Sequence, residues 1–385
     1  MKVIFSRDFV ALILSVAVVG LGTGATLPLT ALALTDAGYG TDVVGLLTAA
    51  QAAGGLLVVP LTSRIAARFS GRQVIVGAVL AVALATALMQ FTSNLWVWGV
   101  LRVVCGVALM LLFTVGEAWV NQLADDASRA RVIAIYATHF TLFQMTGPVL
   151  VSRIAPFAGW RFLACGAVFL LALPMLAAIR ATPRVAGEHE PHGNWRHVLP
   201  RMPALVVGTG FFALFDTLAL SLIPLFAMAH GFAASVAVLF ASALLLGDTT
   251  LQFPIGWLAD HLGRERVHIG AAVVVVLLLA LLPWAVATPW LCWPLLYVLG
   301  GAAGAIYTLS LVACGERFRG AALVSASSLV GASWSVASFG GPLVAGALMK
   351  RIGNDALIGV LLASALSFLF AALWEKRRAA VRALQ

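Results

Sequence analysis

The sequence predicts an all-α membrane protein in which twelve transmembrane helices form two pseudo-symmetric six-helix bundles. Three observations lead to this fold class. Hydrophobic residues make up 62% of the chain and charged residues 10%, with a mean hydropathy of +1.03. Twelve apolar runs reach the length of a membrane helix, and short motifs of the first half return in the second. Because charged residues make up about a quarter of a soluble globular protein, that class is excluded.

A helix needs about 20 mostly apolar residues to cross a bilayer. In the first half such runs cover residues 9–33, 43–61, 73–91, 95–121, 132–155 and 161–179. In the second half they cover residues 204–229, 233–258, 267–288, 290–314, 321–349 and 356–374. The first run is too long for a signal peptide and lacks a small-residue cleavage site, so we expect it to remain as a membrane helix.

The two halves repeat one another. Three pairs of motifs recur at offsets of 192, 199 and 194 positions: Gly71-Arg72 with Gly263-Arg264, Gly116-Glu117 with Gly315-Glu316, and Gly147-Pro148 with Gly341-Pro342. These offsets indicate a duplicated six-helix unit. We therefore expect one bundle at residues 1–180, a cytoplasmic linker at 181–203 and a second bundle at 204–385. The His- and Glu-rich part of the linker is interpreted as a flexible connector rather than a metal site.

Basic residues set the expected orientation in the membrane. With the N-terminus placed in the cytoplasm, 19 of the 24 Lys and Arg residues fall in cytoplasmic segments. Arg102 lies within a span, and the remaining four fall on the other side: Arg153, Arg161, Lys350 and Arg351. This bias satisfies the positive-inside rule and puts both termini in the cytoplasm.

Composition also excludes several functions. The basic residues are scattered between apolar runs and form no stripe, so nucleic acid is not an expected partner. The four cysteines lie inside apolar runs without a C-x-x-C pair, which argues against a disulfide framework and against a metal site. Since no nucleophile and base pair or nucleotide-binding loop is visible, we expect neither an enzyme nor a cofactor. We expect a monomer in the lipid bilayer.

A polar stretch at residues 252–266 separates two long apolar runs. It carries the pattern G-x-x-x-D-x-x-G-R, made by Gly256, Asp260, Gly263 and Arg264. The glycines allow a tight turn and close helix approach. A carboxylate and a guanidinium at this spacing can hold neighbouring helix ends together. The stretch closely resembles the signature loop of the major facilitator superfamily.

The resemblance to this superfamily covers all twelve spans and is closest to its bacterial YcaD-like branch. Three stretches carry it: residues 252–264, residues 116–121 with 129–136, and residues 313–317. It implies a transporter of the bacterial inner membrane whose small-molecule site lies between the halves near the bilayer midplane. The identity of the substrate does not follow from the fold.

The resemblance also implies a conformational latch at the cytoplasmic helix ends. Its expected members are Asp260, Gly263, Arg264 and Glu316 in the second half and Gly71, Arg72 and Glu117 in the first. We expect two equivalent ion pairs, Arg264 with Glu316 and Arg72 with Glu117. The first-half loop departs from the signature because Arg68 stands where the signature has its Asp, so its latch must differ.

Ionisable residues inside a span cost about 2.5–3.5 kcal/mol each on insertion scales, so they usually face a cavity and carry function. Arg102, with Gly106 four residues later, resembles the Arg-x-x-x-Gly motif of the superfamily. This implies an arginine that faces the central cavity and handles protons or substrate. The alternative is a structural arginine that extends toward the periplasmic edge.

Two carboxylates and two further polar residues complete the cavity candidates. Asp216 and Asp248 lie near the middle of the seventh and eighth spans, where each could take up a proton or line a water-filled wall. His139 and Gln144 lie in the fifth span, and a hydrogen bond between helices is the alternative role for both.

Three functions fit these features. The leading hypothesis is a secondary active transporter that works by alternating access and exports a small organic or drug-like compound in exchange for protons. A second is uptake of a small anionic metabolite by proton symport, with Arg102 as its counter-charge. A third is a non-transporting membrane scaffold or sensor built on the same fold.

Overall fold

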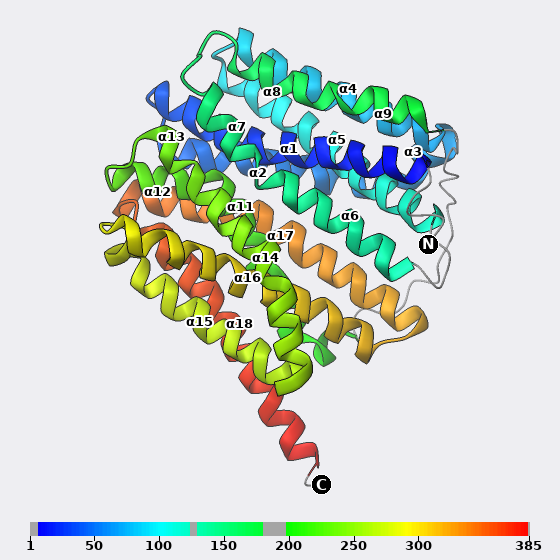
Figure 1. Cartoon of the computed structure of the whole chain (residues 1–385), viewed down its shortest axis with the longest axis vertical. Helices are drawn as coiled ribbons and strands as arrows, with labels where there is room; N and C mark the ends of the chain where they lie inside the picture. The colour runs from blue at the N-terminus through cyan, green and yellow to red at the C-terminus, as the bar shows by residue number, and fades with distance from the viewer. Residues whose placement is uncertain (1–6, 124–128, 180–197, 384–385) are drawn as a thin grey trace.

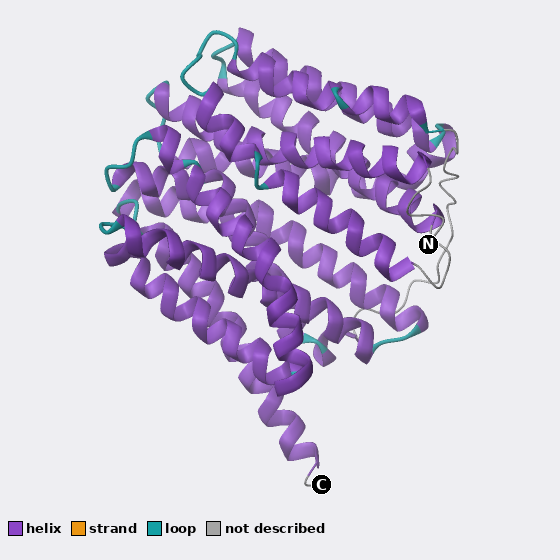
Figure 2. Ribbon diagram, viewed as in Figure 1, coloured by secondary structure: helices purple, strands orange, loops and turns teal. Residues whose placement is uncertain are grey.

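The computed structural model of the chain describes residues 7–123, 129–179 and 198–383. All regular structure in these ranges is helical (Figure 2). Within them, eleven helical segments are long and apolar enough to cross a membrane. The predicted all-α membrane fold is therefore confirmed.

The first half contains nine α-helices and two short 3-10 helices among its described residues. They are α1 (Arg7–Asp36), α2 (Thr41–Val58), η1 (Val59–Leu61), α3 (Thr62–Arg68), α4 (Gly71–Leu88), η2 (Met89–Phe91), α5 (Leu95–Leu123), α6 (Arg129–Gln144), α7 (Gly147–Ile154), α8 (Arg161–Leu170) and α9 (Ala172–Ala178). Their apolar faces meet in a core built mainly from α1, α4 and α5. Apolar side chains along these helices make them stable only against one another or against lipid.

The second half begins with η3 (Leu199–Arg201) and continues through eight α-helices of the described residues. These are α11 (Pro203–Ser221), α12 (Ile223–Ala229), α13 (Ala234–Ala237), α14 (Leu239–Leu262), α15 (Arg264–Ala285), α16 (Pro289–Arg317), α17 (Gly320–Ile352) and α18 (Ala356–Ala383). Val198 and Met202 are buried against Leu205 and Cys314. Packing with the second half therefore begins at Val198, whereas most of the predicted linker lies outside the described residues.

The fifth predicted span is interrupted, which explains why eleven long helices are found. It consists of α6 with 16 residues and α7 with 8, separated by a turn at Met145 and Thr146. Pro148 lies at the start of α7, where its missing N–H costs no hydrogen bond. A Cβ added at Gly147 would collide with the backbone of Gly24 in α1, so the turn lets α7 approach α1 closely. Together α6 and α7 form the remaining span of the expected twelve.

Glycines bring two equivalent helix pairs, α2 with α5 and α14 with α16, into backbone contact. A Cβ added at Gly54 or Gly106 would meet a carbonyl oxygen of the facing helix, and the same holds for Gly247 and Gly300. Gly54 and Gly247 are 193 positions apart, and Gly106 and Gly300 are 194 apart. The same contact therefore occurs in both halves, at the offset of the sequence repeat.

The two ends of the molecule differ in how the halves meet. We call the end at which α1 and α11 begin the linker end, and the end at which α2 and α8 begin the outer end. In Figure 1 the helices of the two halves diverge toward the linker end, near which both chain termini lie. At the outer end α13 contacts α7, and α2 packs along α17.

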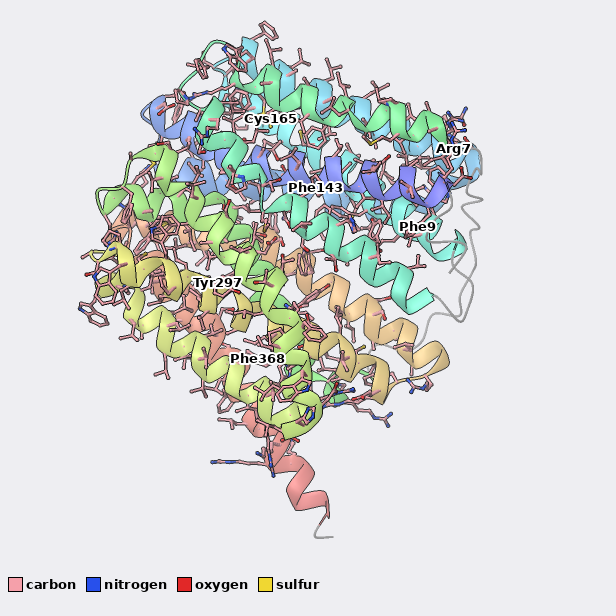
Figure 3. The ribbon with its side chains drawn as sticks, in the orientation of Figure 1. Arg7, Phe9, Phe143, Cys165, Tyr297 and Phe368 are labelled. Atoms are coloured by element: carbon pink, nitrogen blue, oxygen red, sulfur yellow. The ribbon has the colours of Figure 1, made fainter. Side chains whose placement is uncertain are left out.

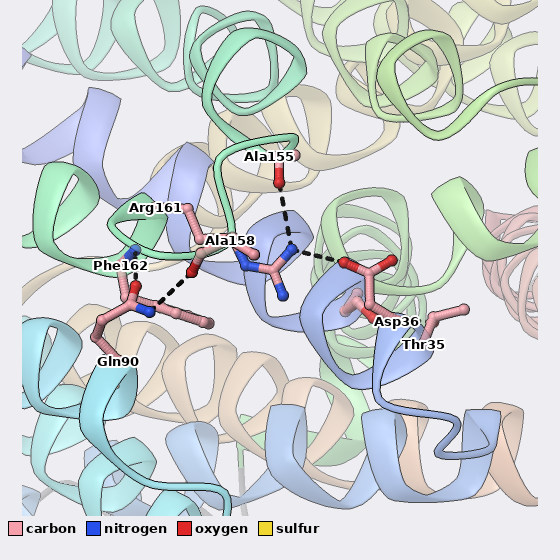
Figure 4. Close-up of polar contacts among 8 residues, drawn as sticks. Thr35, Asp36, Gln90, Ala155, Ala158, Arg161 and Phe162 are labelled. Atoms are coloured by element: carbon pink, nitrogen blue, oxygen red, sulfur yellow. Dashed lines mark hydrogen bonds and ion pairs between the residues drawn. The ribbon is translucent and has the colours of Figure 1, made fainter.

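Hydrogen bonds fix the outer end of the first half (Figure 4). Arg161 donates to the carboxylate of Asp36 at 2.6 Å, which joins α8 to α1. The Gln90 side chain donates to the carbonyl of Ala158 at 2.8 Å and accepts from the backbone N–H of Phe162 at 3.1 Å. These bonds tie the ends of α1, α4 and α8 into one unit that can move as a body.

A glycine substitution tests the repeated backbone contact. In the Gly247→Leu variant the new side chain must push α14 away from the carbonyl of Tyr297. Overpacking of this kind costs about 1–3 kcal/mol or more, so we expect a lower melting temperature for the purified protein in detergent. Gly270→Ala is the control, because its Cβ enters open space. Equal melting temperatures for Gly247→Leu and the wild type would contradict the assigned packing.

Candidate functional site

Arg102 lies deep inside the first half and does not extend toward the membrane edge. Its side chain is 1% exposed. The guanidinium donates from Nε to the carbonyl of Leu47 in α2 and from Nη1 to the hydroxyl of Thr30 in α1, both at 3.4 Å. Among the described residues its Nη2 has no hydrogen-bond partner. Arg102 therefore links α1, α2 and α5, with one donor left over.

The two polar candidates of the fifth span lie apart from each other along α6. The Nδ1 of His139 contacts the carbonyl of Ile135 in its own helix at 2.8 Å. Gln144 is buried at the end of α6. Its backbone packs so closely on α1 that a side chain at Gly20 or Gly24 would meet it. No described hydrogen bond joins either residue to Arg102 or to a carboxylate of the second half.

Asp248 lies in the middle of α14 and is 9% exposed. Its carboxylate accepts a hydrogen bond from Gln252, one helical turn later, at 2.7 Å. Both side chains lie over Gly304 of α16, where an added Cβ would collide with them. The glycine therefore makes the space in which this carboxylate and amide sit.

Asp216 lies in the middle of α11 and is partly buried. Among the residues that the structure describes, its carboxylate has no hydrogen-bond or ion-pair partner. Its charge interacts with that of Asp248 on α14. The neighbouring Thr217 donates to Ser338 at 3.1 Å and so fixes α11 against α17. The structure thus brings together two of the carboxylates that the sequence singled out.

Three aromatic rings lie beside these carboxylates, and sequence analysis missed them. Phe212 of α11 stacks on Tyr307 of α16 with ring centroids 5.0 Å apart and an interplanar angle of 15°. Trp334 of α17 meets Tyr307 edge-on at 5.3 Å. Phe212 and Asp216 are four residues apart, and this spacing places both on one helix face. That spacing is the signal from which the sequence could have predicted a ring beside Asp216. We call the rings of Phe212, Tyr307 and Trp334 the aromatic wall.

Glu117 faces this region from the first half. Its side chain is exposed, and its charge acts on the hydroxyl of Tyr307 across the two halves, as do the charges of Asp216 and Asp248. Glu117 also acts on Tyr136 of α6. The site thus combines carboxylates from α5, α11 and α14 with the rings of α16 and α17.

At the linker end of the second half the expected ion pair is present. Arg264 contacts the carboxylate of Glu316 and also pairs with Asp260 at 3.4 Å. Gly263 has φ +92°, a conformation that residues with a side chain rarely adopt, and it turns the chain from α14 into α15. The glycine is required by the turn, and the turn places Arg264 beside α16.

The equivalent loop of the first half is built differently. Ser70 caps α4 through a reciprocal pair of hydrogen bonds with Gln73, so Gly71 needs no positive φ. Arg72 donates to the carbonyl of Ala177 in α9 at 3.4 Å. Arg72 therefore contacts α9, and its pairing with Glu117 stays a prediction. The loop departs from the signature in sequence and in structure.

At the outer end the halves are joined through α2 and α17. Lys350 donates to the carboxylate of Asp42 at 2.7 Å, and Thr41 donates to the carbonyl of Gly346 at 3.0 Å. Gly45 lies so close to Pro342 that an added Cβ would meet its carbonyl. A charged pair, a hydrogen bond and a close backbone contact together hold α2 against α17.

His268 is a partly buried polar residue that no sequence pattern identified. Its Nε2 lies 3.0 Å from the carbonyl of Ile306 and 3.2 Å from the hydroxyl of Ser310. Its ring packs against Phe368, which Figure 3 labels. Tyr297, labelled in the same figure, bonds to Thr250 at 2.7 Å. These contacts join helices within the second half.

Comparison with known proteins gives the family. The family model described as Major Facilitator Superfamily matches residues 12–247 and 205–385. An uncharacterized MFS-type transporter of Bacillus subtilis, YfkF, is 23% identical over 359 residues, which are 89% of this chain and 88% of the relative. An uncharacterized MFS-type transporter of Enterobacter is 24% identical over 332 residues, 83% of each chain.

Two solved structures share the fold. The crystal structure of the nucleoside transporter NupG has a TM-score of 0.76 and 13% identity, and covers 97% of this chain and 99% of its own. A bacterial homolog of the human lysosomal transporter Spinster, in an inward-facing and unoccupied conformation, has a TM-score of 0.70 and 16% identity, with coverage of 97% and 95%. At these identities the likeness shows the fold alone. Since the family model matches most of the chain, this protein belongs to the Major Facilitator Superfamily of transporters.

Proposed function

We propose that the chain is a proton-coupled secondary transporter that works by alternating access and exports a small organic compound. The observation that carries this proposal is the carboxylate of Asp216, which lies within a spanning helix, has no hydrogen-bond or ion-pair partner among the described residues and interacts with Asp248. A carboxylate in a membrane is stable when it is protonated, paired or hydrated. Asp216 can therefore hold a proton in one conformation and release it in the other.

The join between the halves supports alternating access. Asp42 with Lys350 and Thr41 with Gly346 connect the halves at the outer end, whereas the helices diverge toward the linker end. The carboxylates lie between these ends. A rocking motion that breaks the outer contacts and closes the linker end would move access to Asp216 from one side of the membrane to the other.

The state of Arg102 argues against the alternative of anion uptake. Its guanidinium is 1% exposed and bonded to α1 and α2, so it offers no counter-charge to an anionic substrate in this conformation. The groups that face Tyr307 are carboxylates instead. Membership of a transporter family also argues against the scaffold or sensor role.

Several finer expectations belong to this proposal. We expect bundles at 1–180 and 204–385, a linker at 181–203, cytoplasmic termini in a bacterial inner membrane, a monomer, and kinship with the YcaD-like branch. The bias of 19 of the 24 Lys and Arg residues toward the predicted cytoplasmic segments supports the orientation. A green fluorescent protein fused to the C-terminus should fluoresce in cells, because it folds on the cytoplasmic side. A dark fusion that is present in the membrane would contradict this orientation.

The coupling role of Asp216 is tested by its Asn variant. Asp216→Asn keeps the size of the side chain and fixes it in a neutral form, so it should retain exchange of substrate across proteoliposomes. It should lose accumulation driven by a pH gradient. The measurement compares the two fluxes in wild type, Asp216→Asn and the control Asp355→Asn at the outer end. Uphill transport at the wild-type rate by Asp216→Asn would show that the proton is carried elsewhere.

The outer contact is tested by reversing the charge of Lys350. The pair is partly solvent-exposed, at 58% for Lys350 and 33% for Asp42, so it is worth about 1 kcal/mol or less, which is up to about fivefold in population. Lys350→Glu places two carboxylates together and adds repulsion, so the outer ends should separate more often. The double variant Asp42→Lys with Lys350→Glu should restore the pair.

A cysteine placed at Thr48 reports this opening. Thr48 is buried on α2 nearly two turns inside the pair, and the four native cysteines are buried. We expect a membrane-impermeant maleimide to modify Thr48→Cys faster in the Lys350→Glu background and at the original rate in the double variant. A cysteine at the exposed Trp96 should react equally in every background. Unchanged modification of Thr48→Cys would contradict a gating role for the pair.

A further inference from the structure

We infer that the substrate is an organic cation with a flat aromatic ring, held by the carboxylate of Asp248 against the rings of Tyr307 and Trp334, with Asp216 beside them as the proton carrier. This inference rests on the proposed transport function. It adds the charge and the shape of the compound, which neither the fold nor the family relationship gives.

The charge of the region is negative. Asp216 lies on the same face of α11 as Phe212, which stacks on Tyr307, and Asp248 lies over Gly304, about one turn from Tyr307 on α16. Like charges in a medium of low dielectric constant destabilise one another unless a cation neutralises them. A proton on Asp216 and a cationic substrate at Asp248 can do this. An anion would be repelled by these carboxylates when they are ionised.

The aromatic wall gives the shape of the compound. Phe212 is 7% exposed and stacks on one face of Tyr307, with the two rings nearly parallel at 15°. Tyr307 and Trp334 are partly exposed and meet at 62°. A cation within about 6 Å of such a ring is attracted by the negative ring face, and a flat ring stacks on it. Asp216 follows Phe212 by one helical turn, so charge and aromatic surface share one side of α11.

A metal ion fits the site less well than an organic cation. No group of three or more His, Cys, Asp or Glu residues with the geometry to hold a metal occurs among the described residues. One oxygen of Asp248 is already occupied by Gln252. A carboxylate next to aromatic rings, without further ligands, suits a delocalised charge on a larger body better than a metal ion.

Binding to the purified full chain in detergent, followed by isothermal titration calorimetry, tests this inference without any proton gradient. N-methylquinolinium is the flat aromatic cation, naphthoate the aromatic anion of similar size, and tetrapropylammonium the cation without a ring. We expect N-methylquinolinium to bind at least about tenfold more tightly than either comparison compound, given the strength of cation–π attraction at a desolvated site.

Variants test the contribution of the rings separately from that of the carboxylate. Tyr307→Leu should weaken N-methylquinolinium binding by about three- to thirtyfold, and Tyr307→Phe, which keeps the ring, should bind like the wild type. Asp248→Asn should weaken binding of both cations alike. Glu265→Gln removes an exposed acid of α15 outside the site and is the control. A Trp334→Leu variant provides a second test of the wall should Tyr307→Leu fail to fold.

Preference for naphthoate over N-methylquinolinium would overturn the inference, as would equal binding by Tyr307→Leu and Tyr307→Phe. The outcome is separate from that of the proposed function. Cation binding without pH-driven flux would refute proton coupling and leave the cation site intact. Flux of an anion driven by a pH gradient, in a protein that does not bind N-methylquinolinium, would refute the cation site and leave proton-coupled transport intact.

Discussion

A carboxylate inside a bilayer must be neutralised by a proton, by a cation or by water, and the functional organisation of this protein depends on how it meets that constraint. Asp248 has a hydrogen bond from Gln252, whereas Asp216 has no partner among the described residues. Placing a carboxylate at position 216 costs free energy that an apolar residue there would not cost. Such a cost is understandable when the missing partner arrives and leaves during the transport cycle.

The function resides in residues that the two halves do not share. The glycine contacts of α2 with α5 return in α14 with α16, so the scaffold is duplicated. At the offset of 193 positions, Asp216 corresponds to Thr23 and Asp248 to Gly55, and at the offset of 194 positions Arg102 corresponds to Leu296. The second half therefore carries Asp216 and Asp248 without counterparts in the first, and the first half carries the buried arginine without a counterpart in the second. The two bundles therefore present different ionisable residues to each other. Because of this difference, a rocking motion of the bundles can change the environment of a proton bound between them.

Hydropathy and motif spacing predicted most of the fold, because lipid leaves the backbone few choices besides long helices. The interruption at Met145 was not visible, since it depends on how closely Gly147 approaches α1. The pair of Arg264 with Glu316 followed from the signature loop, but Arg72 contacts Ala177 because Ser70 supplies the turn in place of a positive-φ glycine. The aromatic wall joins α11, α16 and α17, and a contact between distant helices has no local pattern in a sequence.

The two ends of the molecule are expected to open in turn, and distances between spin labels at both ends test this motion directly. Phe69 and Leu262 are exposed near the linker end, and Trp96 and Trp290 at the outer end. With cysteine pairs at these sites, double electron–electron resonance should show a long linker-end distance and a short outer-end distance at rest. Acidification or N-methylquinolinium should shorten the first and lengthen the second. Distances that stay fixed, or that change in the same direction, would contradict alternating access.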